Sequence, residues 1–133
     1  PAGEAPVLSR RHFDAWGEAY LDSDPLSREA QPPAVRTPAG PWYDIARAHH
    51  GDLAYDPAQI RAPVALMRGA WDTLCTDADA AWLFDALRRS RLRRDVKLDR
   101  ATHLMHLEAG RYALYRETVT FLAGGDQAPD QTD

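Results

Sequence analysis

The sequence predicts an α/β fold with parallel strands, and three observations lead to this class. Two short runs, residues 63–69 and 95–99, have the length and composition of strands. Each run is followed by a helix-like segment, residues 76–87 and 110–122. The order strand–helix–strand–helix is typical of a parallel sheet covered by helices. Because such a sheet needs further strands and covered faces, we expect this chain to be part of something larger.

The composition narrows the class of protein. A chain of 133 residues suits one modest domain, and 44% hydrophobic residues is too apolar for a disordered chain. The net charge of −4 gives no electrostatic reason to bind nucleic acid. No apolar run approaches the ~20 residues that span a bilayer, so we expect no membrane contact and a cytoplasmic location. The first residue is Pro1, which leaves the true N-terminus open.

The N-terminal part of the chain is expected to be helical. Ser9 can cap a helix that runs to about Leu21. A proline-rich connection over residues 31–41 follows, and then a helix over residues 42–50 that starts after Pro41 and is ended by Gly51. Residues 52–61 are expected to form an irregular connection. One face of the first helix is aromatic, and we favour core packing over a pocket-lining role for it: Phe13, Trp16 and Tyr20.

The C-terminal part carries the strands. The run 63–69 is almost continuously apolar, as in a strand buried on both faces. Thr76 and Asp79 resemble a capping box that starts the next helix. The last helix is expected to place the following residues on its inner side: Tyr112, Leu114, Tyr115, Thr118, Val119 and Leu122.

An ionisable residue follows each predicted strand. Asp72 comes after the first strand, and His103 comes after the second, one strand–helix–strand unit later. Parallel neighbouring strands end at the same edge of a sheet, where α/β proteins place their chemistry. A carboxylate that hydrogen-bonds a histidine fixes its tautomer and stabilises the imidazolium. The structural alternatives are a turn aspartate and an exposed loop histidine, and we favour the catalytic pair.

Two stretches give the chain a family resemblance. Residues 60–72 read Ile60, Pro63, an apolar strand and then Gly69-Ala70-Trp71-Asp72, and residues 101–108 read Ala-Thr-His-Leu-Met-His-Leu-Glu. They resemble the acid loop and the histidine loop of α/β-hydrolases, and residues 119–122 are similar to that family's usual end. The resemblance implies that Asp72 is the acid of a catalytic triad and that His103 is its general base.

The resemblance also implies an architecture. The chain would be the C-terminal portion of an α/β-hydrolase fold, with the last two parallel strands and their flanking helices preceded by cap-like or lid-like helices. We accordingly expect residues 1–57 to be the end of a helical cap and its return connection. Residues 58–124 would be the strand–helix–strand–helix part of the core, and residues 125–133 a disordered tail.

The nucleophile of that family is missing from the sequence. No Gly-x-Ser-x-Gly motif surrounds any of the serines, which are Ser9, Ser23, Ser27 and Ser90. Cys75 lies in the same loop as Asp72, but we favour a small loop residue over a nucleophile. We therefore expect a truncated sequence, one chain of an enzyme cleaved within its lid, or a short non-catalytic remnant, in that order.

The expected function is hydrolysis of an ester or similar acyl bond of a small, mostly apolar substrate. The candidates for shaping the substrate pocket are Trp71, Leu74, Leu104 and Met105. We expect no cofactor and no metal, because neither His49-His50 nor His103 with His106 is completed by a zinc ligand set. The expected partners are the substrate and the missing N-terminal half. The alternatives are a binding module that uses an exposed sheet edge, or an aspartate nucleophile with dehalogenase or epoxide hydrolase chemistry.

Overall fold

The computed structural model describes residues 3–124 and divides the chain into two compact units. One unit is helical and contains residues 10–56. The other contains the sheet and, among the described residues, is formed by residues 3–9 and 57–124. None of the described helices combines the length and the apolar character that crossing a membrane requires. The expected disordered tail, residues 125–133, lies outside the described residues.

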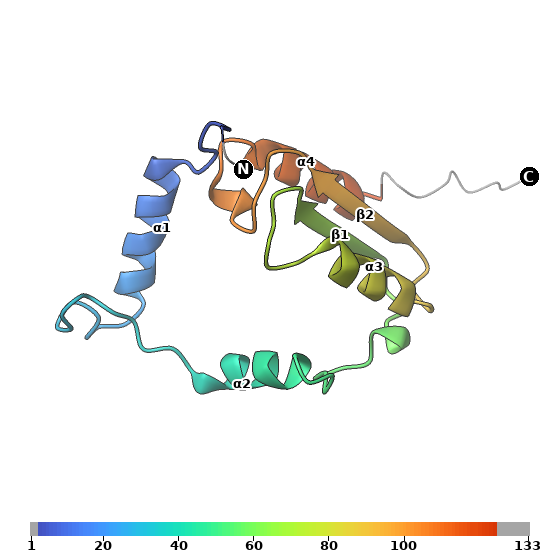
Figure 1. The fold of residues 1–133 in the computed structure, drawn as a ribbon, viewed down its shortest axis with the longest axis horizontal. Coiled ribbons are helices and arrows are strands. Elements are labelled where there is room, and N and C mark those ends of the chain that lie inside the picture. The colour runs from blue at the N-terminus through green and yellow to red at the C-terminus, as the bar shows by residue number, and fades with distance from the viewer. Residues whose placement is uncertain (1–2, 125–133) are drawn as a thin grey trace, which may run out of the picture. The chain divides into compact units, whose positions relative to one another are not determined.

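The sheet unit has the predicted parallel strand pair (Figure 1). Strand β1 (Val64–Gly69) pairs with β2 (Arg93–Leu98) in a register that runs from Val64 opposite Arg93 to Gly69 opposite Leu98. Helix α3 (Asp77–Ala86) connects the strands, and α4 (Arg111–Leu122) follows β2. The α/β class is therefore confirmed. Strand β2 begins two residues earlier than the predicted run, and its alternation of exposed and half-buried residues is typical of a strand.

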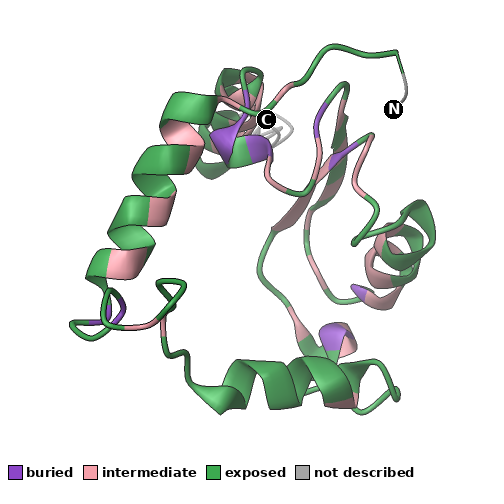
Figure 2. Cartoon of the chain, turned by 60° about the vertical axis from the view of Figure 1, so that its left-hand side comes forward, coloured by how far each residue is buried: buried purple, intermediate pink, exposed green. Residues whose placement is uncertain are grey.

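The two helices cover opposite faces of the strand pair (Figures 1 and 2). Successive side chains of a strand point to opposite faces, and β2 shows this directly. Arg93 stacks on the Phe84 ring of α3, with its guanidinium carbon 4.8 Å from the ring centroid. Its neighbour Arg94 pairs with Glu117 of α4 at 2.6 Å. Two successive residues of β2, both arginines, thus fix α3 on one face and α4 on the other.

The local sequence signals around α3 are confirmed. The Thr76 hydroxyl accepts a hydrogen bond from the Asp79 amide, and the Asp79 carboxylate accepts one from the Thr76 amide at 2.8 Å, which completes the predicted capping box. Arg68 on β1 pairs with Asp95 on β2 through two hydrogen bonds of 2.7 Å and also pairs with Asp77 of α3. These charges hold the start of α3 beside the middle of the sheet.

The inner face of α4 differs from the prediction. Four of the six residues expected inside are exposed, namely Tyr112, Tyr115, Val119 and Leu122. The other two, Leu114 and Thr118, are half-buried, and so are Glu117 and Phe121, which the pattern did not single out. Both stripes have helical spacing, so the apolar pattern alone did not select the buried one.

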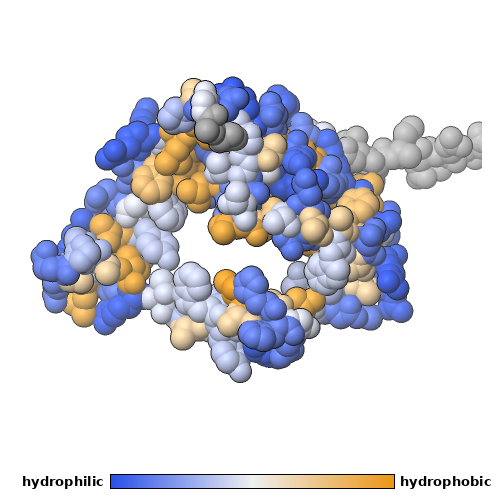
Figure 3. Space-filling view, viewed as in Figure 1, coloured by the Kyte–Doolittle hydropathy of each residue, from blue (hydrophilic) through white to orange (hydrophobic). Residues whose placement is uncertain are grey.

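Few apolar side chains in the described chain are buried. The buried ones are Leu87, Ala101, Met105 and Leu107. Strand β1, predicted to be buried on both faces, is only half-buried except at Gly69. Apolar side chains, orange in Figure 3, reach the surface in several places. A two-stranded sheet offers too little surface to cover its own helices.

We expected the N-terminal residues to belong to the helical segment. In the structure they belong with the sheet unit. Leu8 forms an antiparallel bridge with Glu108. Ser9 donates its amide to the Leu107 carbonyl at 3.0 Å, and Ala109 donates its amide to the Val7 carbonyl at 2.8 Å. Backbone hydrogen bonds of this kind carry no side-chain pattern, so the sequence did not signal them.

The helical unit contains α1 (Arg10–Asp22) and α2 (Ala39–Ala48). Helix α2 begins three residues before the predicted start, so that Pro41 lies in its first turn, where an amide has no partner within the helix. Gly51 follows the helix with φ of 80°, as expected for a residue that ends it. Between the helices, the buried Asp24 carboxylate accepts hydrogen bonds from the Arg36 guanidinium and from the Leu26 and Arg36 amides.

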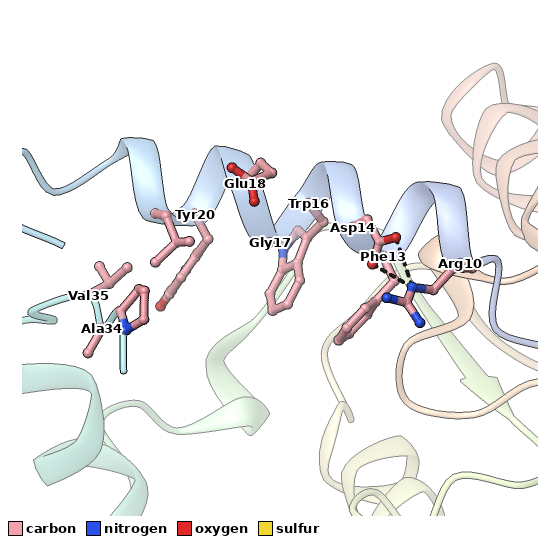
Figure 4. A pocket seen from close by; sticks show the side chains of 11 residues that line it. Arg10, Phe13, Asp14, Trp16, Gly17, Glu18, Tyr20, Ala34 and Val35 are labelled. Atoms are coloured by element: carbon pink, nitrogen blue, oxygen red, sulfur yellow. Dashed lines mark hydrogen bonds and ion pairs between the residues drawn. The ribbon is translucent and has the colours of Figure 1, made fainter. Parts of the chain in front are cut away.

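The aromatic face of α1 does not form a closed core. Phe13 and Trp16 have ring centroids 5.7 Å apart, and Trp16 and Tyr20 lie 5.4 Å apart. These rings and residues 33–35 line an open groove of about 650 Å³ (Figure 4). Trp16 is 42% exposed and Tyr20 is 46% exposed. The rings therefore pack on one another and line a groove that charged residues such as Arg10 and Glu18 also line, and the expected core packing is only partial.

Candidate active site

The two predicted loops meet at the carboxyl ends of the strands, and Gly69 permits this contact. A Cβ atom at position 69 would lie 2.1 Å from the carbonyl oxygen of Ala101 and 2.8 Å from that of Thr102. Just beyond it, the Trp71 amide donates to the Ala101 carbonyl at 2.8 Å, and the Ala70 amide donates to the Leu98 carbonyl at 2.8 Å. The loop after β1 is therefore fixed to the loop after β2 by backbone hydrogen bonds.

Asp72 is a buried carboxylate with both oxygens engaged. Its side chain is 2% exposed. Oδ1 accepts the amides of Leu74 at 2.8 Å and Cys75 at 3.0 Å, and Oδ2 faces the His103 ring. Burial alone would raise the pKa of Asp72, but the hydrogen bonds from Cys75, His103 and Leu74 outweigh it and hold this pKa below its ordinary value. Asp72 is therefore ionised at neutral pH.

The His103 ring is oriented by Asp72. Its Nδ1 lies 3.0 Å from Asp72 Oδ2, and its side chain is 50% exposed. Since the carboxylate can only accept, Nδ1 carries the proton and Nε2 holds the free lone pair. Within residues 3–124, Nε2 has no hydrogen-bond partner. The ring thus presents an accepting nitrogen on its side away from Asp72. The structure brings the predicted pair together.

The buried side chain of Glu108 fixes the loop that carries His103, a role that the sequence did not reveal. It is 2% exposed. Its carboxylate accepts the Thr102 amide at 3.1 Å and also the Thr102 hydroxyl, which in turn accepts the Leu104 amide at 3.1 Å. The residues on both sides of His103 are therefore fixed by one buried acid. The only sequence signal for it was a glutamate five positions after the histidine, in the family resemblance.

Cys75, in the same loop as Asp72, lies close to both members of the pair. One ligand atom each from Asp72, Cys75 and His103 lie within 4.8 Å of one another. The thiol pKa is raised by burial and by the negative charges of Asp72 and Asp79, although the residue as a whole is exposed. A raised pKa leaves Cys75 as a thiol at neutral pH, which disfavours it as a nucleophile.

The four pocket candidates occupy different environments. Leu74 is 72% exposed, whereas Met105 is 8% exposed and belongs to the small core. Trp71 and Leu104 are half-buried. The Arg100 guanidinium lies 5.4 Å from the centroid of the Trp71 ring. Three of the four are thus accessible beside Asp72 and His103, and Met105 supports the loop from inside.

Comparisons with protein-family models, with curated proteins and with solved structures give no match to this chain. The site consists of a buried, ionised aspartate, a half-exposed histidine oriented by it, and a thiol beside both.

Proposed function

We propose that Asp72 and His103 are the acid and the base of a serine-type α/β-hydrolase that cleaves an ester or similar acyl bond of a small, mostly apolar substrate. The nucleophile would lie in sequence upstream of this chain. The observation that carries the proposal is the hydrogen bond of 3.0 Å between His103 Nδ1 and Asp72 Oδ2, which leaves Nε2 open. A serine hydroxyl at Nε2 would complete a triad.

In the proposed reaction, His103 moves a proton twice. Nε2 takes the proton of the serine hydroxyl as its oxygen attacks the acyl carbon, and the ring becomes an imidazolium. It then gives that proton to the departing alkoxide, and repeats both transfers with water to release the acid. Asp72 keeps the ring in one tautomer and stabilises its positive charge without taking the proton. A buried carboxylate anchored by two amides suits this role, because it cannot rotate away.

The rest of the enzyme is proposed as the partner of this chain. Among the described residues, each strand pairs only with the other, so each has one edge without a strand neighbour. Helix α4 also leaves an apolar stripe exposed, and its members are Tyr112, Tyr115, Val119 and Leu122. Further strands and helices of the same hydrolase would cover both features.

The same open edges favour a second candidate function, a non-catalytic binding module that pairs with another protein. The two candidates differ in the upstream reading frame. A Gly-x-Ser-x-Gly segment about 100–150 residues before Asp72 supports the enzyme, since this is the size of the missing part of such a domain. A start codon immediately before Pro1 would leave a chain without a serine elbow and would favour the binding module.

Activity tests the proposed roles directly. In the natural full-length protein, His103→Ala is expected to lower the kcat for p-nitrophenyl acetate by at least about 10³-fold, because it removes the base. The matched control is His106→Ala, a histidine three positions along whose side chain is exposed. It should retain the wild-type rate. Full activity of His103→Ala would reject the triad, and equal loss in both variants would indicate damage to the loop.

A further inference from the structure

We propose that Zn²⁺, or another divalent cation that prefers sulfur ligands, binds to Asp72, Cys75 and His103 and switches the catalytic pair off. The metal-binding part stands on its own geometry, and the regulatory part rests on the proposed hydrolase function. The three side chains supply one oxygen, one sulfur and one nitrogen, all within 4.8 Å of one another. This is the ligand chemistry that zinc takes in proteins.

The required rearrangement is small. At zinc bond lengths of about 2.0–2.3 Å, ligand atoms in a tetrahedral site lie about 3.4–3.6 Å apart. No pair of the three atoms, which lie within 4.8 Å of one another, would therefore have to close by more than about 1.4 Å. Cys75 is exposed and the His103 side chain is 50% exposed, so both can move toward the buried carboxylate. A fourth position would remain open to water.

The local structure brings the sulfur to the carboxylate. The Asp72 carboxylate accepts hydrogen bonds from the amides of Leu74 and Cys75. These bonds close a turn that places Cys75 beside the Asp72 carboxylate. The amides occupy Oδ1, and Oδ2 is the oxygen that faces His103. The carboxylates of Asp72 and Asp79 also give the thiol a negative surrounding, which attracts a cation.

Metal binding would change which nitrogen of His103 carries the proton, and His103 could then no longer act as a base. The cation takes the place of the proton between His103 Nδ1 and Asp72 Oδ2, and that proton moves to Nε2. The thiol of Cys75 loses its proton to solvent as sulfur binds the metal. His103 then carries a hydrogen on Nε2 and can no longer accept one from a nucleophile. Metal binding and catalysis are therefore mutually exclusive at this site.

The binding experiment uses Co²⁺ as the probe with the natural full-length protein and needs no activity. Cobalt bound to a thiolate gives a charge-transfer band in the near ultraviolet, and we expect this band to saturate at one Co²⁺ per chain. Cys75→Ser should abolish it, and His103→Ala should weaken binding by more than about tenfold, since even outer partners of metal ligands contribute about 10–100-fold. His106→Ala is the matched control and should bind as the wild type does.

A band that persists in Cys75→Ser, or equal binding by His103→Ala and wild type, would overturn the metal site. Because His103 is half exposed, its alanine variant tests the ligand without emptying a core position.

A second experiment measures ester hydrolysis with and without Zn²⁺, with EDTA to reverse the effect. Inhibition that disappears in Cys75→Ser, relative to its own metal-free rate, supports the switch, and undiminished inhibition of that variant contradicts it. A protein that binds Co²⁺ as described but hydrolyses no ester would contradict the proposed function and leave the metal site supported.

Discussion

Replacing Gly69 by alanine tests how closely the loop that carries Asp72 must approach the loop that carries His103. The added Cβ would lie 2.1 Å from the Ala101 carbonyl oxygen and 2.5 Å from its carbon. Because ordinary contact begins near about 3.5 Å, the Ala101 backbone would have to retreat by more than about 1 Å. Ala101 stands two residues before His103, and its carbonyl also accepts the Trp71 amide just before Asp72. Moving Ala101 would therefore shift both His103 and Asp72 and change the length of the hydrogen bond between them.

The expected cost has two parts. A displacement of about 1 Å at a catalytic group lowers the rate by about 10²-fold, and forcing an extra methyl into packed structure destabilises it by about 1–3 kcal/mol. The assay compares kcat for p-nitrophenyl acetate and the thermal midpoint in the full-length protein. Gly110→Ala is the matched control, since its Cβ would meet nothing within 4 Å and its φ is −78°. A Gly69→Ala enzyme as active and stable as this control would refute the reasoning.

Three further predictions concern the buried carboxylates and a fourth concerns the folding of the isolated chain; the first three use the full-length protein. Asp72→Asn keeps the side-chain shape but loses the charge that stabilises the imidazolium, so kcat should fall by about 10⁴-fold; a loss below tenfold would argue against an orienting role. Glu108→Gln sets an amide group against the N–H and hydroxyl donors of the histidine loop, and urea titration should show a loss of about 1–3 kcal/mol. The Arg36 guanidinium is the main group that holds the pKa of Asp24 far below its ordinary value, so this carboxylate stabilises the fold above about pH 4 and the contribution is lost as the pH falls further. In Arg36→Ala, hydrogen exchange at the Leu26 amide should therefore accelerate, and it should respond to acid at a higher pH than in the wild type; an unchanged profile would contradict this. The isolated chain of 133 residues should melt without a cooperative transition, because few apolar side chains are buried, and a sharp transition by circular dichroism would show that it folds alone.

The strands, the helices and the meeting of Asp72 with His103 were predictable because their signals are local. Thr76 and Asp79 form the capping box that their spacing indicated. Asp72 and His103 meet because each follows a strand, and paired parallel strands end at one edge. Gly69 could be noticed in the sequence as the end of a strand, but its contact with Ala101 belongs to the folded chain.

The features that sequence reasoning missed depend on contacts between distant residues. Helix α4 is apolar on more than one side, so the pattern placed Tyr112 and Val119 inside although they are exposed. The link between Glu108 and Thr102 joins residues six apart on an irregular loop, for which no periodicity exists. The approach of Cys75 to His103 depends on how the Asp72 turn folds, and a search for paired zinc ligands along the sequence does not detect it.

Covalent labelling of the nucleophile tests the central claim most directly. The full-length protein is treated with a fluorophosphonate, which reacts with a serine only when a neighbouring base activates it, and the labelled residue is located by mass spectrometry. We predict one labelled serine upstream of this chain, in a Gly-x-Ser-x-Gly segment, with a labelling rate that falls by about 10³-fold or more in His103→Ala and is unchanged in His106→Ala. Labelling that proceeds at the same rate without His103, or the lack of any labelled serine, would contradict the role of Asp72 and His103 as the acid and base of a hydrolase.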